Sequence, residues 1–197
     1  MLFRSLSDNT TNSFGGGILN RNGTVTVQRS TLSGNTADFG GGIDNSNTLT
    51  VQNSTLSGNT AHFGGGIDNE GTLTVQNTIV AKNHASRGID ISGGVNAIFS
   101  LLGSTSGATL LVGSHNNLLN VDPHLGPLQN NGGPTMTMAL LANSAAIDAG
   151  DDSVTGPPNG LTADQRGHAR KVGKHVDIGA FEFMPPPPPH HRRGRVF

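Results

Sequence analysis

Apolar and polar residues alternate in short runs along the first half of the chain. The clearest run reads Thr-Leu-Thr-Val at 48–51. Such alternation predicts a short β-strand with one buried face. Triple glycines at 15–17, 40–42 and 64–66 interrupt the pattern and exclude long helices there. The pattern therefore predicts many short strands separated by glycine turns.

These runs recur with a period of 24 residues. The units that begin at Thr24, Thr48 and Thr72 read TVTVQRSTLSGNTADFGGGIDN, TLTVQNSTLSGNTAHFGGGIDN and TLTVQNTIVAKNHASRGIDI. Repeats of this length indicate a solenoid, and short strands favour a right-handed parallel β-helix. We predict an all-β fold with β-helix coils over residues 1–120, in which the repeats are clearest at 5–90. A capping region then follows over 121–183, and a disordered proline-rich and basic tail over 184–197.

Equivalent side chains of successive coils should stack about 4.8 Å apart, which is the spacing of neighbouring strands. Three inward-facing series are expected to form the core: Val25, Leu49 and Leu73; Val27, Val51 and Val75; Ile18, Ile43 and Ile67. An aromatic column is expected at Phe14, Phe39 and Phe63. Corner ladders of stacked amides are expected at Asn35, Asn59 and Asn83 and at Asn20, Asn45 and Asn69.

Composition excludes several classes of function. The chain has no cysteine, so disulfides, thiolate metal sites and thiol catalysis are excluded. The formal net charge is −1 and no basic stripe crosses the body of the chain, so we expect no nucleic-acid binding. Neither a signal peptide nor a membrane-spanning segment is predicted, because no apolar run is long enough.

Two long motifs close the repeat region. They read VDPHLGPLQNNGGPTMTMALLANSAAIDAGD at 121–151 and ADQRGHARKVGKHVDIGAFEF at 163–183. Together with the upstream STLSGNTA and GGGI repeats, they resemble bacterial choice-of-anchor Q domain proteins, which are right-handed β-helix proteins of the pectin-lyase-like superfamily. The resemblance implies an extracellular or cell-surface protein. It supplies no enzyme activity and no catalytic residues.

Aspartates follow the isoleucines of the repeats at Asp44, Asp68 and Asp90. If these carboxylates stack on successive coils, repulsion between them raises their pKa values or attracts a cation. Calcium prefers several oxygen ligands, and Asn45 and Asn69 lie nearby in the sequence. The three aspartates are therefore a candidate calcium site. The alternative is that they point into solvent at a corner.

A second acidic group lies in the C-terminal third. Its members are Asp148, Asp151, Asp152, Asp164, Asp177 and Glu182. Paired carboxylates perform glycoside hydrolysis, and calcium with a basic side chain performs polysaccharide lysis. The bases available on the coils are Arg21, Arg29, Lys82, Arg87, His62 and His84. The simpler interpretation is that these carboxylates cap turns and pair with Arg166 or Arg170.

Threonines occupy the outward positions of the alternating runs. They are Thr24, Thr26, Thr48, Thr50, Thr72 and Thr74. In a β-helix they would form two columns on a flat face, about 6.8 Å apart along the strand. A regular threonine array of this kind is a candidate ice-binding surface. Threonine is also a favoured outward residue on any half-buried strand.

From these patterns we predict a non-enzymatic stalk, adhesin-like or glycan-contacting module, with polysaccharide or a cell-surface glycan as its partner. The alternative is a carbohydrate-active enzyme of the pectin-lyase-like kind, either a polysaccharide lyase or a glycoside hydrolase. Ice binding is a third hypothesis. The chain begins within a repeat, so we also predict self-association through its open N-terminal coil.

Overall fold

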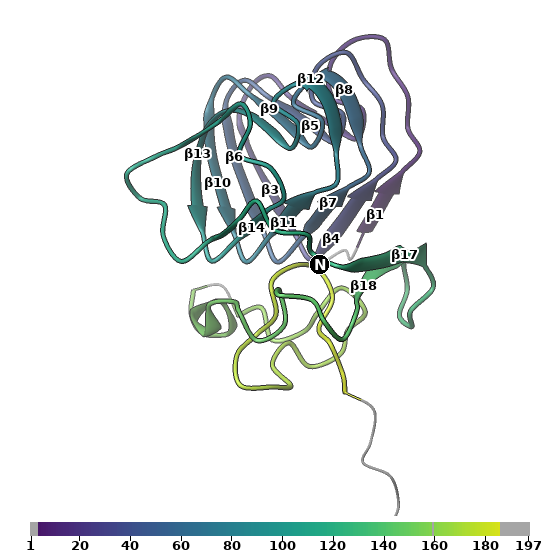
Figure 1. Cartoon of the computed structure of the whole chain (residues 1–197), viewed down its shortest axis with the longest axis vertical. Coiled ribbons are helices and arrows are strands. Elements are labelled where there is room, and N and C mark those ends of the chain that lie inside the picture. The colour runs from purple at the N-terminus through teal and green to yellow at the C-terminus, as the bar shows by residue number, and fades with distance from the viewer. Residues whose placement is uncertain (1–3, 159, 186–197) are drawn as a thin grey trace, which may run out of the picture.

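The chain folds into a parallel β-solenoid with an irregular segment packed along one side (Figure 1). The computed structural model describes residues 4–158 and 160–185. Most of the predicted C-terminal tail, residues 186–197, lies outside the described residues. The fold class predicted from the repeats is confirmed, because strands of successive coils pair in parallel with shifts of 24 residues in the central coils.

Six parallel strands form one wall of the solenoid, which we call the base sheet. In spatial order they are β1 (Arg4–Ser7), β4 (Ser30–Ser33), β7 (Thr55–Ser57), β11 (Ile79–Ala81), β14 (Leu101–Leu102) and β16 (Leu118–Leu119). The last coil is shorter, since Leu101 pairs with Leu118. Within residues 4–158 and 160–185, the parallel stack ends with that coil.

A second sheet forms the side wall. In spatial order its strands are β2 (Ile18–Asn20), β5 (Ile43–Asn45), β9 (Ile67–Asn69), β13 (Ile91–Ile98), β10 (Thr72–Gln76), β6 (Thr48–Gln52) and β3 (Thr24–Gln28), and β15 (Ala108–Leu110) pairs with β13. A short third sheet joins β8 (Thr60–Phe63) and β12 (His84–Arg87). Together the three sheets enclose one core.

The core is filled by the inward ladders that the alternation predicts. Leu49 pairs with Leu73, Val51 with Val75 and Ile43 with Ile67, and all six side chains are fully buried. Val25 and Ile18, in the first coil, pack against the same cluster but are only partly buried. Strands β1, β2 and β3 are terminal in their sheets, and self-association at this edge stays a prediction.

Strand β13 is the longest because one corner of the coil is missing. Asn69 pairs with Gly93 after 24 residues, whereas Thr74 pairs with Asn96 after only 22. The two residues lost between these pairs would form the bend that separates β9 from β10 in the preceding coil. The chain therefore runs straight from one part of the side wall to the other.

The C-terminal segment covers the outward face of the base sheet. It contains the antiparallel pair β17 (Leu125–Gln129) and β18 (Thr137–Leu140) and the 3₁₀ helix η1 (Asp152–Thr155). Ile79 and Leu101 of the base sheet share a second apolar cluster with Leu140 and Ile178 of this segment. We expected this region to cap an end of the stack. The structure places it along the side, beneath the base sheet in Figure 1.

Buried polar contacts join the segment to the solenoid. The Thr31 hydroxyl donates to Gln165 Oε1 at 2.6 Å, and the Ala180 amide donates to Thr55 Oγ1 at 3.1 Å. These threonines point outward from the base sheet, and both are buried beneath the segment. Buried polar groups need hydrogen-bond partners, so these two bonds fix where the segment lies on the base sheet.

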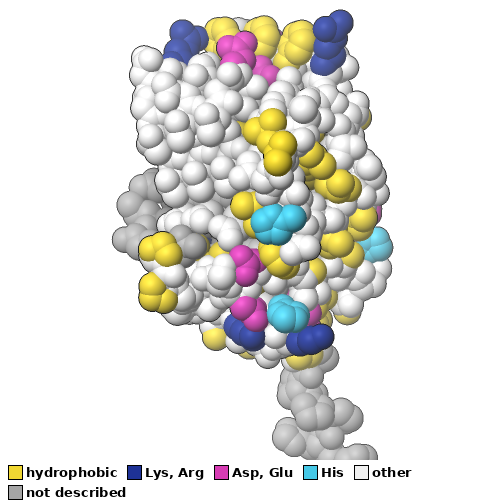
Figure 2. All heavy atoms as spheres, turned by 90° about the vertical axis from the view of Figure 1, so that its left-hand side faces the viewer, with side chains coloured by type: hydrophobic (Ala, Val, Ile, Leu, Met, Phe, Trp, Pro, Cys, Tyr) yellow, Lys and Arg dark blue, Asp and Glu magenta, His cyan; other side chains and the backbone are white. Residues whose placement is uncertain are grey.

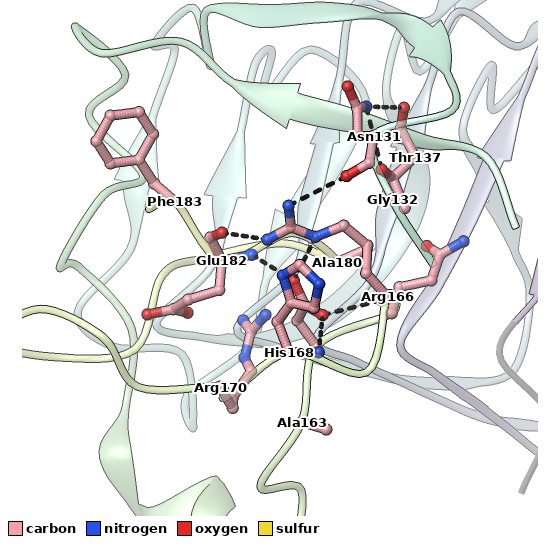
Figure 3. Close-up of polar contacts among 12 residues, drawn as sticks. Asn131, Gly132, Thr137, Ala163, Arg166, His168, Arg170, Ala180, Glu182 and Phe183 are labelled. Atoms are coloured by element: carbon pink, nitrogen blue, oxygen red, sulfur yellow. Dashed lines mark hydrogen bonds and ion pairs between the residues drawn. The ribbon is translucent and has the colours of Figure 1, made fainter. Parts of the chain in front are cut away.

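A charged network organises the segment itself (Figure 3). Arg166 Nε donates to Asp164 at 2.8 Å, and Arg166 Nη2 donates to the Glu182 carbonyl oxygen at 2.6 Å. Arg170 is completely buried and donates to the backbone carbonyls of Asp177 and Gly179. Burial raises the pKa of Glu182 to about 7 and lowers the pKa of Arg170. The second acidic group of the sequence thus contributes to internal structure.

No helix within residues 4–158 and 160–185 has the length and apolar character needed to cross a membrane.

Candidate functional site

A column of phenylalanines runs along one outer corner of the solenoid. Phe14, Phe39 and Phe63 pair in register immediately before the glycine turns. The ring centroids of Phe14 and Phe39 lie 5.0 Å apart, and those of Phe39 and Phe63 lie 5.2 Å apart. The ring planes differ by 20° and 6°, so the three rings are stacked. Repetition of the coil therefore produces a continuous aromatic surface.

Both ends of the column are covered by arginine. The Arg21 guanidinium carbon lies 4.5 Å from the Phe14 ring centroid, and that of Arg87 lies 5.8 Å from the Phe63 ring centroid. Both distances suit cation–π attraction. Phe14 is 37% exposed. Figure 2 shows hydrophobic, basic and acidic side chains together along the upper edge of the solenoid.

An acidic column lies beside the aromatic one. Asp44 pairs in register with Asp68, one coil further along. The turn between the two columns requires glycine, because Gly40 has a φ of +61° and a Cβ there would lie 2.2 Å from the Ile43 carbonyl oxygen. This tight turn folds the chain back on itself. A surface hollow joins the columns, with Phe14, Arg21, Asp44 and Glu70 among its lining residues.

Burial and neighbouring carboxylates raise the pKa values of Asp44 and Asp68. Burial, together with the charges of Asp68 and Glu70, raises the pKa of Asp44 to about 6, and Arg21 opposes the shift. Burial also raises the pKa of Asp68, which a hydrogen bond with Ser92 partly offsets. The site therefore combines aromatic ring edges with carboxylates whose negative charge is not fully balanced by nearby positive charge. We call Phe14, Phe39, Phe63, Asp44 and Asp68, with Glu70 and the two flanking arginines, the aromatic–acidic strip.

The structure does not bring Asp90 to the other two predicted calcium ligands. Ser92, and not Asp90, pairs with Asp68, because the 24-residue period continues through Ile91. Asp90 instead ends the corner ladder of asparagines. Its Oδ1 accepts from the backbone amide of Asn83 at 3.1 Å and from Asn83 Nδ2 at 2.9 Å. The Gly-Ile-Asp motif at 88–90 therefore resembles the earlier motif without occupying the same position.

The asparagine ladders themselves consist of successive amide hydrogen bonds. Asn35 Nδ2 donates to Asn59 Oδ1 at 2.8 Å, and Asn59 Nδ2 donates to Asn83 Oδ1 at 2.9 Å. Asn20, Asn45 and Asn69 form a parallel ladder, with bonds of 2.7 and 2.6 Å. These side chains are buried, so they serve the corners of the fold.

Among the residues that the structure describes, no group of three or more His, Cys, Asp or Glu side chains is placed to hold a metal ion. Asp44 and Asp68 are the two predicted ligands that lie together. Calcium binding by this pair stays a prediction.

The predicted threonine array lies on the outer face of the side wall. Thr24, Thr48 and Thr72 pair in one column, and Thr26, Thr50 and Thr74 in the other. Beside them a ladder of glutamine amides joins Gln28, Gln52 and Gln76 through bonds of 2.8 and 3.0 Å. Ice binding by this array stays a prediction.

Acidic residues just before and at the start of η1 make internal contacts. Asp148 Oδ1 accepts from the His175 amide at 2.9 Å, and Asp152 Oδ1 accepts from the Val176 amide at 2.9 Å. Asp152 Oδ2 also forms an ion pair with Lys171 at 2.5 Å. These bonds hold one loop of the C-terminal segment against another, as expected for carboxylates that cap turns.

Sequence reasoning missed two features of the strip. Glu70 has no counterpart in the repeat pattern, so its approach to Asp44 follows from the coil geometry alone. The second feature is the position of Arg87, which takes the place of Phe63 one repeat later and pairs with it in register. A strict 24-residue alignment of the sequence places Arg87 at the position equivalent to Phe63.

Replacing Asp44 with asparagine should stabilise the protein above pH 6. The folded-state pKa of Asp44 is about 6, against an ordinary value of 3.8, so its ionisation opposes folding as the pH rises through that interval. The neutral amide removes this cost, and we expect a gain of about 1 kcal/mol at pH 8. Urea unfolding at pH 8 and at pH 4 measures it. Equal effects at both pH values would contradict the argument.

Comparison with known proteins adds no relative. No protein-family model matches the sequence, and no curated protein or solved structure matches it either. The resemblance to choice-of-anchor Q domain proteins therefore depends on the motifs of the chain itself.

Proposed function

We propose that this chain is a non-enzymatic, exported or surface-displayed β-helical module that contacts glycans through the aromatic–acidic strip. The observation that carries the proposal is the stacked column of Phe14, Phe39 and Phe63 beside the carboxylates of Asp44 and Asp68. Sites for small polar molecules typically combine apolar or aromatic surface with a few polar groups that fix orientation.

A sugar offers both partners that such a strip requires. Its C–H groups pack on aromatic carbon, and its hydroxyl groups donate hydrogen bonds to carboxylates. The strip repeats with the coil, at about 4.8 Å per rung. An extended polysaccharide would therefore meet similar groups on successive coils, and several weak contacts would add up along one chain.

The surface location is supported by the resemblance to choice-of-anchor Q domain proteins. A solenoid also suits a stalk or an adhesin-like module, because each coil contacts only its neighbours and the whole presents an elongated surface. Glycan contact is the part of the proposal that binding experiments address directly.

The test is affinity electrophoresis of the purified chain through gels that contain different neutral and charged polysaccharides. We expect at least one polysaccharide to retard the protein. Replacing Phe14, Phe39 and Phe63 together with leucine should weaken that retardation about tenfold or more, since loss of aromatic anchors commonly removes 1–2 kcal/mol of binding. Leucine keeps apolar volume at these partly exposed positions, and circular dichroism checks that the variant is folded.

The matched control replaces Thr26, Thr50 and Thr74 with alanine, on the same three coils but on the side wall. This variant should bind as the parent does. If the threonine variant loses binding and the leucine variant keeps it, the side wall is the ligand surface and the proposal is wrong. If none of the polysaccharides retards the parent protein, glycan contact is excluded for that panel.

A carbohydrate-active enzyme is the second candidate, and the electrostatics of Asp44 favour it. A pKa of about 6 beside a second carboxylate is the property expected of a general acid in glycoside hydrolysis. Release of reducing ends from a retained polysaccharide, abolished in Asp44→Asn, would establish this candidate in place of the non-enzymatic one.

A further inference from the structure

We propose that the aromatic–acidic strip selects glycans with protonated amino groups, such as polymers of non-acetylated amino sugars. This inference rests on the proposed glycan contact and adds the chemical class of the ligand. It comes from the hollow that Asp44 shares with Phe14, Arg21 and Glu70.

The Asp44 carboxylate is the first line of evidence. Asp44 is only 6% exposed, yet within the described residues its side chain has neither a hydrogen bond nor an ion pair. Its carboxylate is largely screened from water and has no donor in that part of the protein, so a donor supplied by a ligand would stabilise it. Because Asp44 lines the hollow, that donor can reach it from solvent.

The charge at the hollow is the second line of evidence. Asp44 and Glu70 line the hollow together with one basic residue, Arg21. Asp68 pairs in register with Asp44 and adds a third carboxylate beside it. None of the three carboxylates takes part in an ion pair within the described part of the chain. An ammonium group brings three hydrogen-bond donors, together with the positive charge of the ion-pair partner that these carboxylates lack among the described residues.

The aromatic column is the third line of evidence, and it is independent of the carboxylates. Its two terminal rings already hold guanidinium groups, at 4.5 Å for Arg21 and 5.8 Å for Arg87. These contacts within the protein indicate that the phenylalanine surface accommodates cations. A glycan with amino groups would combine C–H packing on the column with charge neutralisation in the hollow.

The experiment compares two oligosaccharides of equal length and linkage by isothermal titration calorimetry at pH 7. One is a β-1,4-linked glucosamine hexamer with free amino groups, and the other is its fully N-acetylated counterpart. We expect the free-amine hexamer to bind at least tenfold more tightly. We also expect this preference to shrink at high salt, since salt screens attraction between exposed charges.

Two variants with the same change in net charge locate the effect. Asp44→Asn should remove most of the preference for the free-amine hexamer. Asp122→Asn should keep it, because Asp122 is an exposed carboxylate that pairs with Lys82 elsewhere on the molecule. Thermal unfolding of each variant confirms that it remains folded.

The outcomes separate this inference from the proposed function. Equal binding of both hexamers, with loss in the phenylalanine-to-leucine variant, would overturn the amine preference and leave glycan contact standing. Binding of neither hexamer, with another polysaccharide still retained through the column, would also overturn only the amine preference. Retention of no glycan at all would overturn both the amine preference and glycan contact.

A separate measurement tests a metal ion as the occupant of the hollow. A rise in melting temperature with calcium that Asp44→Asn abolishes would assign the hollow to a metal ion and overturn the inference.

Discussion

Replacing Arg170 with methionine should lower the free energy of unfolding by about 3–5 kcal/mol, the usual cost of removing one partner from a buried charged network. The Arg170 side chain is fully buried and donates to the carbonyl oxygens of Asp177 and Gly179. Methionine has a similar length and no donor. The variant leaves these carbonyls without the guanidinium and removes the positive charge that lowers the pKa of Glu182.

The loss should depend on pH in a defined direction. In the parent protein the pKa of Glu182 is raised to about 7 from an ordinary 4.5, so protonation already stabilises the folded state below pH 7. Without Arg170 the charged form becomes still less favourable. We therefore expect the destabilisation of Arg170→Met to be larger at pH 8 than at pH 5. Urea unfolding at the two pH values measures the difference.

Limited proteolysis locates the damage, because weakened packing of the C-terminal segment should expose its loops to cleavage before the solenoid. The control is Lys171→Met, one residue along. Lys171 is 45% exposed and pairs with Asp152 at the surface, so its loss should cost less than about 1 kcal/mol. Similar losses in the two variants, or an Arg170 effect that does not change with pH, would contradict the assigned role of Arg170.

The solenoid could be predicted from the sequence because its determinants are local and repeated. Alternation at Leu49 and Val51 identifies a strand, and recurrence at Leu73 and Val75 identifies its neighbour. Each coil contacts the next, so a fixed period specifies the register. The same reasoning leads to the phenylalanine stack and the asparagine ladders, whose members lie at equivalent positions of successive coils.

The placement of the C-terminal segment could not be predicted in this way. Its contacts join residues far apart in the chain, such as Thr31 with Gln165, and no periodicity relates them. The outward positions of the base sheet do contain a signal, because Thr31 and Thr55 are followed at the equivalent positions by Ile79 and Leu101. Outward apolar residues on later coils indicate a covering element, although they do not identify it.

Two amide ladders of the solenoid end at aspartates. The glutamine ladder ends where Gln76 Nε2 donates to Asp151 Oδ2 at 3.1 Å, and Asp151 belongs to the C-terminal segment. The asparagine ladder ends at Asp90, within the solenoid. In each ladder every amide donates to the next coil, so the final donor needs an acceptor that does not itself require another partner. An ionised carboxylate meets this need because it only accepts hydrogen bonds.

Replacing Asp90 with alanine should therefore destabilise the solenoid by about 2–4 kcal/mol, the cost expected when buried donors lose their acceptor. Three donors are affected: the backbone amide and Nδ2 of Asn83, and the amide of Ser104, which lies 2.6 Å from Asp90 Oδ2. Asp90 is itself buried. Thermal unfolding followed by circular dichroism measures the loss, and backbone hydrogen exchange should rise first at Asn83 and Ser104.

Asp90→Asn separates the acceptor from the charge. The amide oxygen can still accept from Asn83, whereas its NH₂ group faces the Ser104 amide, which is also a donor. We expect about half the loss seen with alanine. Asp38→Ala is the surface control, because Asp38 is half-exposed and contacts His62 only at 3.6 Å. If alanine at 90 costs no more than alanine at 38, the ladder does not depend on its terminal carboxylate, and Asp90 regains its place among the candidate ligands of the acidic site.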